Sequence, residues 1–172
     1  MIAVITSSIV AQPYPQSVCY TGPMKHEDIM KLAFEEAELA VREGNAPFAC
    51  IIVDKEGDII AKDHDRVKEL MDPTAHGEIN VIRSLCKKLQ SLSLRDYTFY
   101  TTSEPCPTCM TAMIKAKVAT VYFGAKTEET ASLPIPAEFI ASKSLKSPIS
   151  VTGGILAEEA LEQRNRLLAT IG

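Results

Sequence analysis

Short segments rich in β-forming residues alternate along this chain with segments whose apolar residues recur at the spacing of an α-helix. The expected strands are residues 48–53, 59–61, 97–101, 118–123 and 149–151. The expected helices are residues 25–43, one beginning at Thr74, one opened by residues 105–107, and residues 137–143 and 156–168. This alternation predicts an α/β fold with helices on both faces of a sheet. The helix expected between the last two strands permits them to be parallel and excludes a tight hairpin.

The first half of the chain contains two expected connections. Residues 55–58 favour a turn, so the first two strands are expected to form a hairpin. Residues 63–73 are polar and are expected to form a loop, after which Thr74 can cap the next helix with its hydroxyl group. The core face of that helix is expected to include Ile79, Ile82 and Leu85.

Composition and charge limit the class of protein. The 172 residues are 46% hydrophobic and 23% charged, which is typical of one soluble domain. Prolines and a glycine at positions 13–23 separate an N-terminal arm, residues 1–23, from a body, residues 24–172. No apolar run reaches the roughly 20 residues that span a membrane. The net charge of −4 argues against tight nonspecific binding of nucleic acid.

The cysteines indicate a reducing compartment, such as the cytoplasm. There are five of them, an odd number that does not suggest a disulfide framework. Cys106 and Cys109 form a C-x-x-C pair, which favours a metal or a redox use.

Two short motifs, each placed at the start of an expected helix, carry the candidate chemistry. His76-Gly77-Glu78 is the first, and Pro105-Cys106-Pro107-Thr108-Cys109 is the second. Zinc binds imidazole and thiolate, and a catalytic zinc site keeps one tetrahedral position open, so His76, Cys106 and Cys109 are the expected ligands. Glu78 can stand beside the metal without binding it and move protons between water and substrate.

Other interpretations of these residues remain open. The C-x-x-C pair could be a redox pair, although such motifs usually follow the first strand of a domain and this one follows the third. A structural zinc site would need a fourth ligand, which Cys50 or Cys86 could supply. Each of these cysteines also suits a buried apolar position. His26 and His64 suit surface or packing positions better than metal binding.

The combination H-x-E followed by P-C-x-x-C is typical of nucleobase deaminases. From about residue 25 to 168 the chain resembles the cytidine deaminase superfamily, in the branch of guanine deaminase, fungal-type cytosine deaminase and tRNA adenosine deaminase. Residues 72–76 resemble the first and last of these enzymes, residues 103–107 with Cys109 resemble guanine deaminase, and residues 154–159 resemble the tRNA enzyme.

The resemblance implies a three-layer α/β/α sandwich with a five-stranded mixed sheet, a zinc ion, and a catalytic Glu78. It also implies that Phe48, Asp65 and Gly77 contact a purine or pyrimidine base. A homodimer is expected, with Met110, Met113 and Ile114 on the exposed faces of the motif helices. The leading hypothesis is deamination of a free base or nucleoside, guanine first. The alternatives are a tRNA adenosine deaminase, a cytosine deaminase and a catalytically silent zinc-binding fold.

Two departures from the family pattern concern the substrate. The family usually has an asparagine that touches the base where this chain has Asp65. Either Asp65 reads a base edge that offers N–H, or it points to solvent and pairs with Arg66 or Lys62. Guanine deaminases also use an acidic residue beyond the fourth strand, and residues 132–136 contain none.

Overall fold

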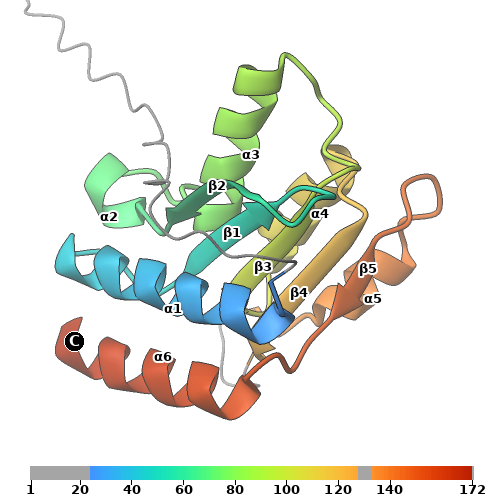
Figure 1. Cartoon of the computed structure of the whole chain (residues 1–172). Helices are drawn as coiled ribbons and strands as arrows, with labels where there is room; N and C mark the ends of the chain where they lie inside the picture. The colour runs from blue at the N-terminus through green and yellow to red at the C-terminus, as the bar shows by residue number, and fades with distance from the viewer. Residues whose placement is uncertain (1–23, 128–132, 172) are drawn as a thin grey trace, which may run out of the picture.

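The computed structural model describes residues 24–127 and 133–171 (Figure 1). The predicted N-terminal arm, residues 1–23, lies outside these ranges. In chain order the elements are α1 (His26–Arg42), β1 (Ala49–Val53), β2 (Ile59–His64), α2 (Val67–Leu70), α3 (Gly77–Leu89), β3 (Thr98–Ser103), α4 (Pro107–Lys115), β4 (Thr120–Ala125), α5 (Ala137–Ser142), β5 (Ser150–Thr152) and α6 (Ala157–Ile171). Apart from α2, this is the predicted order.

The strands of the described chain form one mixed sheet in the order β2-β1-β3-β4-β5. β1 pairs antiparallel with both β2 and β3, whereas β3, β4 and β5 run parallel. The parallel last strand agrees with the crossover expected from the sequence. The five-stranded mixed sheet of the predicted fold is therefore confirmed.

Helices cover both faces of the sheet, α1 and α6 on one and α3, α4 and α5 on the other (Figure 1). Side chains of β1 alternate between the faces, as the period of a strand requires. Cys50 and Ile52 join the apolar cluster under α3 and α4, while Ile51 and Val53 join the cluster under α1. Burial on both faces explains why this strand is an unbroken apolar run. No helix in the described ranges is both long and apolar enough to cross a membrane.

The segment between β2 and α3 differs from the predicted polar loop. β2 extends to His64, because the full length of β1 offers it a partner and Ala49 pairs with His64. Residues Val67–Leu70 then form the short helix α2. Thr74 does not cap α3: its N–H and hydroxyl groups donate to Asp72 Oδ1 at 2.8 and 2.7 Å in a local turn. The residue before the helix is His76, in an extended conformation.

The expectation of an exposed apolar face on α4 is wrong. Met110 and Met113 are fully buried, and Ile114 is half-buried. Both methionines point into the cluster between the sheet, α3 and α4, because α4 lies directly on the sheet. These side chains therefore give no support to the expected homodimer.

α6 lies close against the sheet because β4 contains a glycine facing it. A Cβ atom on Gly124 would lie 2.7 Å from the Cβ of Ala160 and 2.7 Å from the carbonyl oxygen of Thr102. No larger residue fits without a shift of the backbone. This close packing brings the middle of α6 to the end of β3, where the motif residues lie.

Candidate active site

The two motifs meet where α3 and α4 begin. His76 immediately precedes α3, Cys106 immediately precedes α4, and Cys109 lies in the first turn of α4. His76 Nδ1 is 3.6 Å from Cys106 Sγ and 3.5 Å from Cys109 Sγ, and the donor atoms all lie within 4.8 Å of one another. One nitrogen and two sulfur donors at this spacing suit zinc, with a tetrahedral position left for water or substrate.

The sequence around the cysteines explains their placement. Past the end of β3, the N–H of Glu104 donates to the carbonyl oxygen of Ala125 at 2.8 Å, so strand-like pairing continues up to the motif. Pro107 occupies the first position of α4, where a proline is pre-organised for the helix and its missing N–H costs nothing. The helix N-terminus then lies at the sulfur atoms, and its partial positive charge favours thiolate.

The protonation of the three donors is strongly coupled when no metal is bound. The Cys109 thiol donates to Cys106 and lowers the pKa of Cys106 to about 4, with His76 acting in the same direction. In turn, Cys106 raises the pKa of His76 to about 9. The pKa of Cys109 is raised, first by its hydrogen bond to Cys106 and then by burial. Metal binding therefore has to displace protons from this group.

Glu78 lies one helical position beyond Gly77, and its side chain reaches the same site. The residue is 8% exposed, and burial raises the pKa of its carboxyl group. It lines the cavity together with His76 and Cys106. A carboxyl group so placed is within the region where a substrate proton would be transferred.

A cavity of ≈ 350 Å³ opens beside the motif residues. Phe48, just before β1, forms part of its wall, as the sequence predicts for a substrate contact. The end of β3 contributes Thr101, Thr102 and Ser103. The volume is in the range of small-molecule sites.

One wall of this cavity was not anticipated from the sequence. It is formed by Arg164, Asn165 and Leu168 of α6, which lie almost sixty residues beyond the second motif. Arg164 is 9% exposed and donates to the carbonyl oxygen of Lys126 at 3.2 Å. A signal was present: the buried residues Ala160, Arg164 and Leu167 share one helical face, where an arginine is unusual.

Asp65 and Gly77 are not among the described residues that line the cavity. Asp65 is 5% exposed, and its Oδ1 accepts hydrogen bonds from the N–H groups of Ala46 and Val67 at 3.4 and 3.3 Å. The alternative that Asp65 points to solvent is therefore wrong. A Cβ on Gly77 would lie 2.9 Å from the carbonyl oxygen of Asp63, so this position needs a glycine to pack α3 against β2. A base contact by either residue stays a prediction.

The cysteines and histidines outside the motifs have other environments. Within the described ranges, the group able to hold a metal consists of His76, Cys106 and Cys109. Cys50 and Cys86 instead pack in or against an apolar cluster, so neither supplies the fourth ligand of a structural site. His26 Nδ1 is hydrogen-bonded to the hydroxyl group of Tyr100 at 2.7 Å, and His64 is buried between two carboxylates.

Comparison with known proteins identifies the family. The family model described as the cytidine and deoxycytidylate deaminase zinc-binding region matches residues 23–125. The chain belongs to this family. The match contains all three candidate ligands and Glu78, so the resemblance seen in the sequence is confirmed. Membership of a zinc-binding deaminase family, together with the converging donors, also identifies zinc as the cofactor and argues against a redox pair.

Similar proteins include tRNA-specific adenosine deaminases and guanine deaminases. The tRNA-specific adenosine deaminase of Aquifex aeolicus (strain VF5) is 41% identical over 102 residues, covering 59% of this chain and 67% of that protein. The guanine deaminase of Bacillus subtilis (strain 168) is 38% identical over 118 residues, covering 68% and 75%. A solved structure from a study of A-to-I editing by tRNA:A34 deaminases is 31% identical with a TM-score of 0.70, covering 79% of this chain and 98% of that one.

Proposed function

We propose that this protein is a zinc-dependent hydrolytic deaminase of a free amino-substituted nucleobase. Among the possible bases we favour purines, and guanine first. The observation that carries the proposal is that His76, Cys106 and Glu78 line a cavity of ≈ 350 Å³, with Cys109 converging on the first two as a third metal donor. Ammonia and the oxo base would be the products.

The chain's own residues can perform the reaction in this arrangement. His76, Cys106 and Cys109 would hold zinc, which when bound supplies the Lewis acidity that makes water a nucleophile at neutral pH. Glu78 takes one proton from the attacking water and gives it to the ring nitrogen. It then moves the remaining proton of the added hydroxyl group to the amino group, which leaves as ammonia. Phe48 offers an aromatic surface for the base.

Charge favours a free base over a nucleic acid. α6, which lines the cavity, exposes Glu158, Glu159 and Glu162, and the whole chain has a net charge of −4. Exposed carboxylates on this helix, with the net negative charge of the chain, repel phosphate groups and weaken binding of a polynucleotide. A second candidate is deamination of adenosine in tRNA, because tRNA-specific adenosine deaminases are prominent among the relatives.

Ammonia release from a panel of substrates tests this proposal. The panel comprises guanine, adenine, cytosine, their nucleosides, and an anticodon stem-loop RNA with adenosine at the wobble position. We expect release from a free base, led by guanine. Turnover of the stem-loop alone would establish the second candidate. Zinc-loaded protein that is inactive on every member would support the silent zinc-binding fold.

Asp65→Asn is expected to change the order of substrate preference. The amide keeps an oxygen that accepts from Ala46 and Val67, so folding should be retained. The amide also replaces one carboxylate oxygen, an acceptor, by an NH2 group, a donor, toward the base. A buried polar group without a hydrogen-bond partner costs about 1–3 kcal/mol. We expect relative kcat/KM values across the panel to change about ten-fold or more. Unchanged ratios would show that Asp65 does not read the base.

We also propose a homodimer in the cytoplasm. The family resemblance supports the dimer, as does Met71, which is 88% exposed in the segment leading to His76. The cytoplasm is supported by the thiol ligands, which need a reducing compartment. Sedimentation velocity at micromolar concentration should give twice the mass of 18.8 kDa, and a monomer would contradict the dimer.

A further inference from the structure

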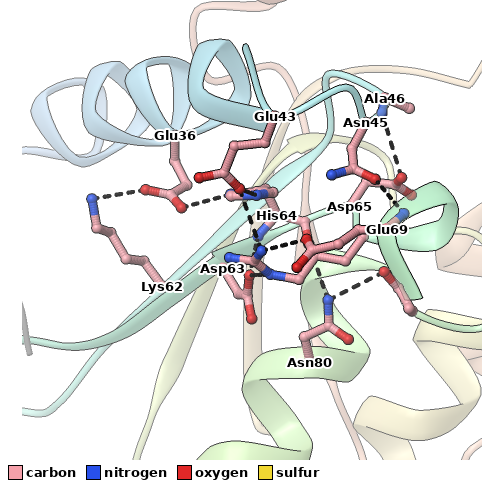
Figure 2. A network of polar contacts seen from close by, with 12 residues as sticks. Glu36, Glu43, Asn45, Ala46, Lys62, Asp63, His64, Asp65, Glu69 and Asn80 are labelled. Carbon is pink, nitrogen blue, oxygen red and sulfur yellow. Dashed lines mark hydrogen bonds and ion pairs between the residues drawn. The ribbon is translucent and has the colours of Figure 1, made fainter. Parts of the chain in front are cut away.

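His64 is a fully buried histidine that lies outside the cavity and has no task in the proposed reaction. Its Nδ1 is 2.8 Å from Glu36 Oε1 and its Nε2 is 3.0 Å from Glu43 Oε2. Figure 2 shows the ring between the two carboxylates. Each ring nitrogen therefore faces a carboxylate oxygen within hydrogen-bonding distance. Glu36 belongs to α1, and Glu43 is the residue directly after the helix. The ring therefore joins the end of β2 to the far end of α1, which ends at Arg42 just before Glu43.

Glu36, on one side of the ring, contacts a second side chain as well as His64. Glu36 is 5% exposed and also pairs with Lys62 at 2.7 Å. Burial acts to raise the pKa of Glu36, but hydrogen bonds from His64 and Lys62 outweigh it and hold the pKa below its ordinary value. His64 and Lys62 both contact this buried carboxylate, and removal of a partner would leave its charge less well compensated.

The backbone at and after His64 supports the active-site residues. The N–H of Asp65 donates to the carbonyl oxygen of Phe48 at 2.8 Å, and the N–H of Arg66 donates to that of Ala75 at 2.9 Å. Phe48 lines the cavity, and Ala75 immediately precedes the zinc ligand His76. The same short segment thus holds two parts of the site.

α3 is fastened to this segment by a side chain and by close packing. Asn80 Nδ2 donates to the carbonyl oxygens of His64 and Ala75 at 3.0 and 3.1 Å (Figure 2). The first residue of α3, Gly77, lies so near that a Cβ on it would be 3.1 Å from His64 Cα. His64 is therefore packed closely against the start of α3, where His76 and Glu78 lie.

We propose that His64 is a positioning residue for the metal site: by clamping the end of β2 to α1, it holds the start of α3, and with it His76 and Glu78, in place for zinc. The inference rests on the proposed function only in that the positioned zinc site is taken to catalyse deamination. The clamp itself is tested through zinc and needs no substrate, so its failure is distinguishable from failure of the deaminase proposal.

His64→Gln tests the clamp, because a glutamine side chain has a single nitrogen and cannot place one at each of the two positions that the ring nitrogens occupy. His26→Gln is the matched control, since it makes the same substitution at an exposed histidine that is hydrogen-bonded to Tyr100 and is not among the residues that line the cavity. Zinc release to the chelator 4-(2-pyridylazo)resorcinol and the visible absorption of the cobalt(II)-substituted protein are measured. We expect His64→Gln to release zinc about 10-fold faster, as for other supporting residues of metal sites, with a changed cobalt spectrum. His26→Gln should match the parent.

A purely structural role gives a different result. His64→Gln would then lower the unfolding temperature of the zinc-free and zinc-loaded protein equally, with the parent release rate and cobalt spectrum, and this outcome would overturn the proposal. If His64→Gln fails to fold, Glu43→Gln decides: its side chain is 41% exposed, so the fold should tolerate it. We expect it to release zinc two- to five-fold faster, and a parent rate would refute the clamp.

Discussion

Glu78→Gln is expected to keep one zinc ion per chain and to lower kcat by about 10²–10⁴-fold or more. The substitution preserves the size of the buried side chain but removes the group that accepts and returns protons. Zinc should stay because Glu78 is not among the three converging donors. The measurements are zinc content by elemental analysis and turnover of whichever substrate the panel identifies.

Glu159→Gln is the control for this variant. It makes the same change on the exposed face of α6 and should leave turnover at the parent level. A Glu78→Gln protein as fast as the parent would show that another group moves the proton. Loss of zinc from Glu78→Gln would show instead that the carboxylate holds the metal, and the division of roles proposed here would be wrong.

Removal of zinc is expected to abolish turnover and to lower the unfolding temperature. The three ligands join the starts of α3 and α4, so a bound ion ties these helices together. Zinc at about 100 times its Kd stabilises the folded state by ~2.7 kcal/mol. For a domain of this size that corresponds to about 5–10 °C in unfolding temperature. Thermal unfolding before and after dialysis against a chelator measures the difference, and added zinc should restore it.

Comparison of Cys109→Ser with Cys86→Ser distinguishes a zinc ligand from a cysteine that does not bind the metal. Cys109 belongs to the converging group, whereas Cys86 packs against the apolar cluster under α3. Cys109→Ser should lose zinc and turnover, and its unfolding temperature should no longer respond to the metal. Cys86→Ser should retain both zinc and turnover. Equal zinc content in the two variants would contradict the assignment of Cys109.

The sequence alone predicts the ligand set, because the chemistry is carried by short motifs with fixed spacing. Cys106 and Cys109 stand three positions apart at a helix start, which brings their sulfur atoms together whatever surrounds them. The order of strands and helices is also predicted, since it depends on local periodicity. The short helix α2 is missed, because polar residues at positions 63–73 carry no apolar period.

Packing decided what the local pattern left open. Whether Met110 and Met113 face solvent depends on which side of α4 meets the sheet, and the structure buries both.

The remaining features depend on contacts between distant segments. Arg164 reaches the cavity because α6 packs on Gly124, and His64 becomes a clamp because β2 ends beside α1. The sequence by itself determined the element order and the three residues that converge as metal donors, and it singled out the glutamate that we propose moves protons; all of these follow from local spacing. Only the tertiary structure decided the wall of the cavity and the support beneath the site, because burial and long-range pairing create those partners and no local pattern encodes them.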